Sequence, residues 1–269
     1  MIGVLILSVL AVSTHGQETV RVSNMDQQQF DSLYESFVKL LNKTEIPINI
    51  QWQKLGLHFS EDQQALYLKS DDLTLFGQGE IVISKDLKNN IYPIMIQVPH
   101  KYFDRHSGTI GRGIFEQGGF HVYMENTVQR YTTEWSDMAH ESKSLFAAFT
   151  MAYTEVYPHS VVVQVHGFSS RKRHSKVARY ADVILSNGTP LYDDFIRKIQ
   201  QCHRIELGLV SRVFGLDVFE LGATTNTIGA ILNKDKNGHF VHLELSAETR
   251  EKNRDENWLR KMGSCLKIR

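Results

Sequence analysis

Residues 160–165 read SVVVQV, an almost unbroken run of apolar side chains that ends at His166 and Gly167. Three further runs of this kind follow the same pattern: YPIMIQV at residues 92–98, ADVILS at 181–186 and FVHLEL at 240–245. Short apolar runs are typical of strands that are covered on both faces of a sheet. We therefore predict four central strands.

Segments with helical spacing lie before and between these runs. Apolar side chains recur on one helical face over residues 26–42, where Asp26 can cap the start, and again over 137–156 and 191–202. A further strand is expected over residues 80–84, at a sheet edge. The alternation of strands and helices predicts an α/β fold with helices on both faces of a mixed, mainly parallel central sheet.

The first 16 residues have the character of a secretory signal peptide. Their apolar core, residues 2–12, is shorter than the ~20 residues that a membrane-spanning helix needs, and Ala11, Ser13 and Gly16 offer small residues for cleavage. No Lys or Arg precedes the core, so a buried first strand or helix is the alternative. We expect a mature chain of residues 17–269, folded as one domain, in the extracellular space or a bacterial periplasm, with no membrane association.

Composition narrows the class of partner and the redox setting. The chain has 30 Lys and Arg against 30 Asp and Glu in 269 residues, which gives no electrostatic case for nucleic acid. Its two cysteines, Cys202 and Cys265, form either one disulfide or two buried thiols. Glycosylation is expected at Asn42-Lys-Thr44 and Asn187-Gly-Thr189 if the host supports it.

Three of the predicted strands end at, or contain near their end, a side chain that binds metal or moves protons. These are His100 after the first run, His166 after the second, and Glu244 inside the last. Ligands gather beyond the carboxyl ends of strands in open α/β sheets, so these side chains are expected to converge. Each histidine alone is as often a structural residue, but the set of three favours a site.

Zinc is the metal that this combination suggests. It takes neutral imidazoles and a carboxylate and leaves one position open for water, whose pKa it lowers to about 7. Asp104 is the nearest carboxylate after His100, and an H-x-x-x-D spacing aims both side chains at one point if the loop turns as a helix does. Asp137 and His140 are rival ligands, although a helix cap and a substrate-facing histidine describe them better.

The strand-His-Gly/Ser pattern at residues 161–169, the strand-Glu pattern at 242–246 and the pair Pro99-His100 resemble the superfamily of zinc carboxypeptidases, succinylglutamate desuccinylases and N-formylglutamate amidohydrolases. The resemblance implies a zinc exopeptidase-like fold, with His166 as the second metal histidine and Glu244 as the general base. Asn126-Thr-Val-Gln-Arg130 resembles the element that binds a substrate carboxylate. Phe103 stands where the carboxypeptidase pattern has its acidic ligand, so the identity of that ligand stays open, and residues 17–90 match poorly.

Other polar residues are candidates for substrate binding. Arg130 and the basic run that starts at Arg171 are expected to orient an anionic substrate, with His140 lining the pocket. Asn226, in the loop Gly222-Ala-Thr-Thr-Asn226, either faces a substrate carbonyl or closes a turn. A serine hydrolase is disfavoured because Ser169 and Ser170 lack a G-x-S-x-G context.

These features predict a secreted hydrolase with one zinc ion per chain, which cleaves an amide bond in an acylated amino acid or a peptide-like substrate. His100, Asp104 and His166 are the expected metal ligands, and Glu244 is the expected base. The alternatives are a catalytically silent binding module of the same fold, and a metal-dependent esterase or deacetylase, because the same activated water attacks esters.

Overall fold

The computed structural model describes residues 25–43, 57–70, 79–85, 93–235 and 238–268, so the expected signal peptide and part of the first sequon lie outside the described residues. The elements are α1 (Gln27–Leu41), β1 (Leu57–Glu61), β2 (Ala65–Ser70), β3 (Gly79–Ser84), β4 (Ile94–Val98), α3 (Ser107–Gly118), β5 (Val122–Asn126), α4 (Leu145–Val156), β6 (Ser160–Phe168), the short helix η1 (Ser170–Lys172), α5 (Lys176–Arg179), β7 (Val183–Ser186), α6 (Asp194–Leu207), β8 (Ser211–Val213), α7 (Thr227–Asp235), β9 (Gly238–Ser246), α8 (Ala247–Lys252) and α9 (Glu256–Cys265).

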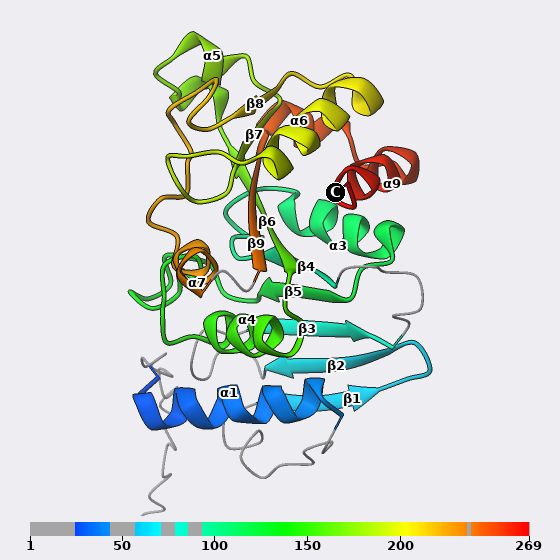
Figure 1. Cartoon of the computed structure of the whole chain (residues 1–269), viewed down its shortest axis with the longest axis vertical. Helices are drawn as coiled ribbons and strands as arrows, with labels where there is room; N and C mark the ends of the chain where they lie inside the picture. Colours follow the sequence, from blue (N-terminus) through cyan, green and yellow to red (C-terminus); the bar gives the residue numbers. More distant parts are fainter. Residues whose placement is uncertain (1–24, 44–56, 71–78, 86–92, 236–237, 269) are drawn as a thin grey trace, which may run out of the picture.

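The strands form one sheet with the order β1-β2-β3-β5-β4-β6-β9-β7-β8. Strands β5, β4, β6 and β9 run parallel in its centre, β3 joins this block antiparallel through β5, and β7 joins it antiparallel through β9 (Figure 1). The expected mixed sheet with a parallel centre is therefore confirmed. The strand expected at an edge, β3, instead lies between β2 and β5, because the hairpin of β1 and β2 extends the sheet beyond it.

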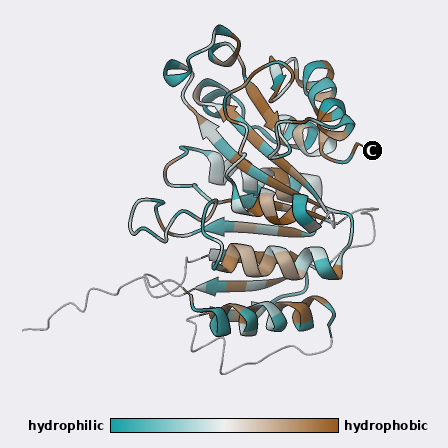
Figure 2. Cartoon of the chain, turned by 60° about the vertical axis from the view of Figure 1, so that its left-hand side comes forward, coloured by the Kyte–Doolittle hydropathy of each residue, from teal (hydrophilic) through white to brown (hydrophobic). Residues whose placement is uncertain are grey.

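Helices cover both faces of the sheet, as expected. On one face α1 packs on α4 and α4 contacts α7, and on the other α9 packs against α3 and α6 (Figure 1). Alternate residues of each central strand supply the two apolar cores: Val162 faces the first layer of helices, and Val161 and Val163 face the second. The central strands carry long hydrophobic stretches in Figure 2. Helix α1 shows both polar and apolar residues, because only one face of it is buried.

One predicted helix begins later than its apolar spacing suggests. The segment expected to be helical from residue 137 forms turns as far as Ser144, and α4 begins at Leu145. The hydroxyl of Ser144 accepts a hydrogen bond from the N–H of Ala147, which caps the helix there. The turns before it leave Asp137 free to contact a histidine of the site.

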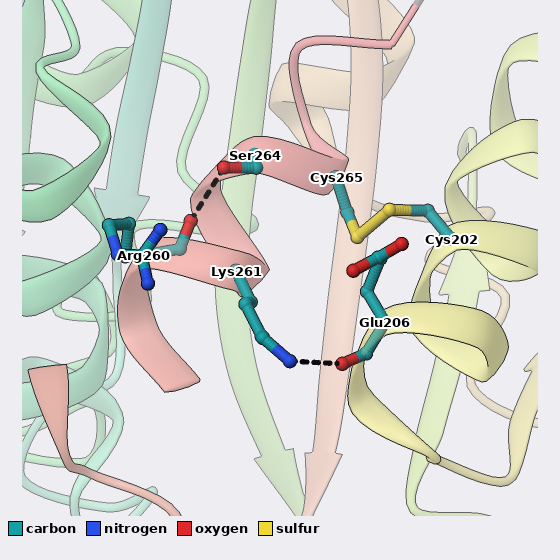
Figure 3. The surroundings of a disulfide bond; sticks show 6 residues. All are labelled: Cys202, Glu206, Arg260, Lys261, Ser264 and Cys265. Carbon is teal, nitrogen blue, oxygen red and sulfur yellow. Dashed lines mark hydrogen bonds between the residues drawn. A yellow bond between two sulfur atoms is a disulfide. The ribbon is translucent and has the colours of Figure 1, made fainter. Parts of the chain in front are cut away.

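Cys202 and Cys265 form a disulfide between α6 and α9, with their Cα atoms 5.5 Å apart (Figure 3). Lys261 adds a second link between the same helices by donating to the carbonyl of Glu206 at 3.0 Å. At the second sequon, the side-chain amide of Asn187 donates to the carbonyl of Leu191 at 2.9 Å, so the nitrogen that would carry a glycan is engaged in the fold. No helix in the described ranges is both long and apolar enough to cross a membrane.

Candidate metal centre

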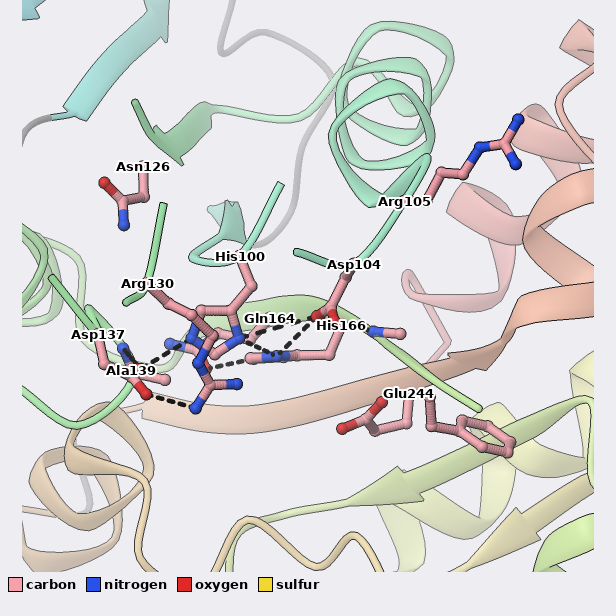
Figure 4. A network of polar contacts seen from close by, with 12 residues as sticks. His100, Asp104, Arg105, Asn126, Arg130, Asp137, Ala139, Gln164, His166 and Glu244 are labelled. Carbon is pink, nitrogen blue, oxygen red and sulfur yellow. Dashed lines mark hydrogen bonds and ion pairs between the residues drawn. The ribbon is translucent and has the colours of Figure 1, made fainter. Parts of the chain in front are cut away.

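His100, Asp104 and His166 converge at the carboxyl end of the parallel strands (Figure 4). His100 follows β4, and His166 lies near the end of β6, its neighbour in the sheet. The Nδ1 atoms of the two histidines are 3.1 Å apart, and Oδ2 of Asp104 lies 3.8 Å from the first and 3.7 Å from the second. All three side chains are at most 6% exposed.

The chain after β4 turns as a helix does, which brings Asp104 next to His100. The N–H of Asp104 donates to the carbonyl of His100 at 2.8 Å, the i to i+4 bond that the H-x-x-x-D spacing requires. The N–H of Gly167, on β6, donates to Oδ2 of Asp104 at 3.0 Å and holds the carboxylate beside His166. The triad therefore depends on one local turn and on the pairing of two strands.

The partner of Nε2 in each histidine determines which ring nitrogen carries the proton. Nε2 of His100 lies 2.8 Å from Oδ1 of Asp137, and the carboxylate of Asp137 also pairs with Arg130 at 2.5 Å. A carboxylate that accepts from an arginine is ionised and has no proton to donate. Nε2 of His100 therefore carries a hydrogen, and in the neutral ring its Nδ1 presents a lone pair to the triad.

A buried chain of side-chain amides fixes the position of the proton on His166. Its Nε2 lies 3.2 Å from Oε1 of Gln164, and that oxygen also accepts from the side-chain amide of Asn226 at 2.7 Å. The amide nitrogen of Gln164 donates to Gln97 at 2.9 Å, and Gln97 donates to Thr150 at 2.7 Å. The bonds to Asn226 and Gln97 fix the amide of Gln164 with its oxygen toward His166. The neutral ring of His166 therefore donates from Nε2, and its Nδ1 also presents a lone pair.

This arrangement fits a zinc ion. Two imidazole lone pairs and a carboxylate oxygen face one another with no proton between them, which is unfavourable without a cation. Ligands 2.0–2.2 Å from a tetrahedral zinc ion are about 3.4 Å apart, and the three separations here are 3.1, 3.7 and 3.8 Å. The donor set, the spacing and the proton positions all match.

The surroundings keep His166 neutral and the nearby acids charged. Burial lowers the pKa of His166 to about 4, despite the favourable effect of Asp104. Burial of Asp104 raises its pKa, but His166, His100 and the N–H of Gly167 together outweigh this, so that the pKa is lower than normal. The pKa of Asp137 is also well below normal, because hydrogen bonds to His100 and His140 and the charge of Arg130 outweigh its burial. These are the ionisation states that zinc binding needs.

Glu244 lies beside the triad on β9 (Figure 4) and is paired with His166 in the parallel register of β9 and β6. It is 7% exposed, and its Oε2 has no hydrogen-bond partner in the part of the chain that the structure describes. Burial, together with the negative charge of Asp104, raises its pKa to about 8. Such a carboxyl group is poised to exchange a proton near neutral pH.

His242, two residues before Glu244, lies on the same face of β9. Its ring is 4.5 Å from the ring of His166 between centroids, and its Nε2 is 3.8 Å from Oε1 of Glu244. Burial and the neighbouring histidines lower its pKa well below normal. His166, His242 and Glu244 form a second donor group, but His166 has one lone pair and the first triad uses it. Because they share this lone pair, the two groups could not each hold an ion at the same time.

The other predicted residues have varied surroundings. Arg130 lies at the site, paired with Asp137 and packed near the rings of Phe103 and Tyr131. His140 is half exposed, with Nδ1 3.2 Å from Oδ1 of Asp137. Arg171 is exposed on η1.

Two predicted substrate-binding residues are instead used inside the protein. Asn126 is fully buried, and its amide bonds to the carbonyl of Ser136 at 3.1 Å and the N–H of Val128 at 3.0 Å, closing the loop that carries Arg130. Asn226 is 3% exposed and bonds to Gln164 and to the N–H of Gly229 at the start of α7. Both amides are therefore buried and bonded within the fold, and their contact with a substrate stays a prediction.

Two residues at the site, Gln164 and His242, were not anticipated from the sequence. A usable signal was present, because side chains at i and i+2 share a face of a strand. Gln164 is two residues before His166, and His242 is two residues before Glu244. Polar residues in these positions of otherwise apolar strands mark the face on which the site lies.

The sequence matches no protein-family model, and no curated protein is significantly similar to it. Similar solved structures include a metallo-carboxypeptidase from Pseudomonas aeruginosa, with 10% identity, coverage of 71% of this chain and 60% of that chain, and a TM-score of 0.45. A metallo-carboxypeptidase from Burkholderia cenocepacia has 7% identity, covers 91% of this chain and 69% of that chain, and has a TM-score of 0.45. A bacteriophage poly-gamma-glutamate hydrolase has 12% identity, covers 70% of this chain and 86% of that chain, and has a TM-score of 0.42.

Proposed function

We propose that this chain is a zinc-dependent hydrolase that cleaves an amide bond, with His100, Asp104 and His166 as the metal ligands. One observation carries the proposal: two buried histidine nitrogens and a carboxylate oxygen meet 3.1–3.8 Å apart, and the partners of both Nε2 atoms place the proton of each neutral ring on Nε2. When both rings are neutral, the partners of Nε2 leave no proton to bridge the facing nitrogens, and a cation is the group that both lone pairs can bind.

Zinc bound there would polarise a carbonyl group and lower the pKa of a water molecule. Glu244 is the group of this chain that would take the proton of the attacking water and pass it to the leaving amine. A buried carboxyl group works as a base only when it is ionised, and positive charge at the triad favours that form. Its neighbours Arg173, Arg250 and Arg130 act in the same direction.

An anionic substrate is part of the proposal. Arg130 is held in place by Asp137, and Arg171 lies in the loop directly after β6, so both supply positive charge at the end of the sheet where the triad lies. His140, half exposed and next to Asp137, is placed to contact the same substrate. The expected substrates are acylated amino acids or peptide-like molecules with a free carboxylate, hydrolysed outside the cell if residues 1–16 act as a signal peptide.

The metal content of the purified protein tests the proposal. We expect about one zinc per chain in the wild type, measured by elemental mass spectrometry, and its loss in His100→Ala and His166→Ala. His159→Asn is the matched control, because His159 is exposed, lies outside the site and has a φ of 65° that asparagine tolerates. Absence of metal together with absence of zinc uptake would refute the proposal.

A panel of substrates distinguishes an amidase, an esterase or deacetylase, and a silent binding module. Turnover of N-acyl amino acids or peptides would support the amidase, and turnover of acetyl esters alone would support the esterase or deacetylase. Stoichiometric zinc without turnover of either class would favour a silent binding module. The buried carboxyl group of Glu244 beside the triad, whose Oε2 has no hydrogen-bond partner among the described residues, favours an active site, because a proton-transfer group in this position suits catalysis.

A further inference from the structure

Arg250 is a buried arginine close to the candidate metal centre, and its charge is the one property of it that the proposed chemistry uses. It lies on α8, directly after β9, and is 6% exposed. Among the described residues it forms no ion pair, although the carboxylates of Asp104 and Glu244 both attract its charge. A buried charge of this kind is costly unless its hydrogen bonds are satisfied, so the partners of its guanidinium group are informative.

Three backbone carbonyls accept the hydrogen bonds of this guanidinium group. Nε donates to Leu245 at 3.1 Å, Nη1 donates to Arg105, and Nη2 donates to Phe168 at 3.4 Å. Leu245 directly follows Glu244, Arg105 directly follows Asp104, and Phe168 is two residues after His166. Each of these three site residues thus lies one or two residues from a carbonyl that the same side chain binds.

Gly167 completes the arrangement. A Cβ atom at this position would lie 2.2 Å from Cζ of Arg250 and 2.4 Å from its Nε, so the guanidinium group lies flat against the glycine backbone. The N–H of the same glycine donates to Oδ2 of Asp104 at 3.0 Å. Gly167 therefore lies in contact with both the arginine and the acidic candidate ligand.

We propose that Arg250 is a positioning residue, which fixes Asp104, His166 and Glu244 relative to one another by binding the backbone of all three segments. The inference rests on the proposed metal site and adds a residue that neither binds the metal nor touches the substrate. A planar guanidinium group is suited to the task, because its donors point in three fixed directions. A lysine ammonium group cannot reach all three carbonyls with the same geometry.

The test compares Arg250→Met with a control, Arg112→Met. Arg112 is less deeply buried, with 29% of its side chain exposed, and lies on α3, where it pairs with Glu80 and packs on Tyr123 away from the triad. We expect Arg250→Met to bind zinc 10–100-fold more weakly, measured by competition with a chelating dye, and to change the visible absorption spectrum of the cobalt-loaded protein. Arg112→Met should lower stability without changing either quantity.

Two further variants keep the test decisive if Arg250→Met does not fold. Arg250→Lys retains the charge and should bind zinc with intermediate affinity. Gly167→Ala retains the arginine but displaces it, and should also weaken zinc binding and alter the cobalt spectrum. Wild-type zinc affinity and an unchanged cobalt spectrum in folded Arg250 variants would overturn the inference and leave the metal site intact. Absence of zinc binding by the wild type would instead overturn the proposed function.

Discussion

Glu244 is the direct neighbour of His166 in the parallel pairing of β9 with β6. Side chains that are paired in this way project from the same face of the sheet, so the candidate base and a candidate metal ligand are held together by the backbone hydrogen bonds of two central strands. Because the proposed base and the proposed ligand lie on different strands, each can be changed without removing the other.

Glu244→Gln should retain zinc and lose hydrolysis. Glutamine preserves the size of the side chain but cannot accept a proton from water, so the rate should fall by about 10²–10⁴-fold. The measurement is kcat on the best substrate of the panel, beside zinc content by elemental mass spectrometry. Full activity in a variant with normal zinc content would remove Glu244 from the mechanism.

Asp137→Ala should weaken zinc binding by about 10–100-fold, because Nε2 of His100 would lose the acceptor that fixes its proton. Asp137→Asn is the matched comparison, since its amide oxygen can still accept from Nε2, and it should lose less affinity. Chelator competition measures both. Equal affinity in wild type and Asp137→Ala would show that the position of the proton does not depend on Asp137.

Acid should destabilise the protein through His203. This histidine on α6 is fully buried, neither ring nitrogen has a partner among the described residues, and burial lowers its pKa to about 3. The unfolded chain binds a proton at this residue below a pH of about 6.5, whereas the folded protein does not until about pH 3. The free energy of unfolding should therefore fall with decreasing pH in this window, by about 1.4 kcal/mol per pH unit for this group.

His203→Leu tests this expectation, because leucine removes the titration. Urea unfolding of the metal-free protein at pH 7, 6, 5 and 4 should give a shallower decline for His203→Leu than for the wild type. The remaining decline reflects other groups whose pKa values are lower than normal, among them His121 and His166, at about 4, and His242. The exposed variant His159→Asn should follow the wild type. An unchanged slope in His203→Leu would contradict the assignment.

Loss of the disulfide should cost stability and spare the metal centre. Cys202 and Cys265 are 63 residues apart in the sequence, and a closed loop of this length restricts the unfolded chain by about 4 kcal/mol. The bond joins α6 and α9, on the face of the sheet opposite the triad. Cys202→Ser with Cys265→Ser should unfold at lower urea concentration but bind zinc with wild-type affinity. A parallel loss of zinc affinity would show that the two faces are coupled.

The sequence by itself determined the local features of this protein. Apolar runs predicted the central strands, the capped apolar face of residues 26–42 predicted α1, and the spacing of His100 and Asp104 predicted that one turn would bring them together. Where a residue bonded to a distant partner, local spacing was misleading. The helix predicted from residue 137 was too long because Asp137 contacts His100 and Ser144 caps α4.

Only the tertiary structure decided which residues surround the triad. Gln164 meets Gln97 and Asn226, Glu244 meets His166, and Arg250 reaches Arg105 and Phe168, all across sequence separations of more than 60 residues. These contacts depend on the order and register of the strands β4, β6 and β9, which arise from the packing of the whole sheet. Local periodicity shows that a side chain faces one side of a strand, but the neighbour that it meets there is determined by the fold.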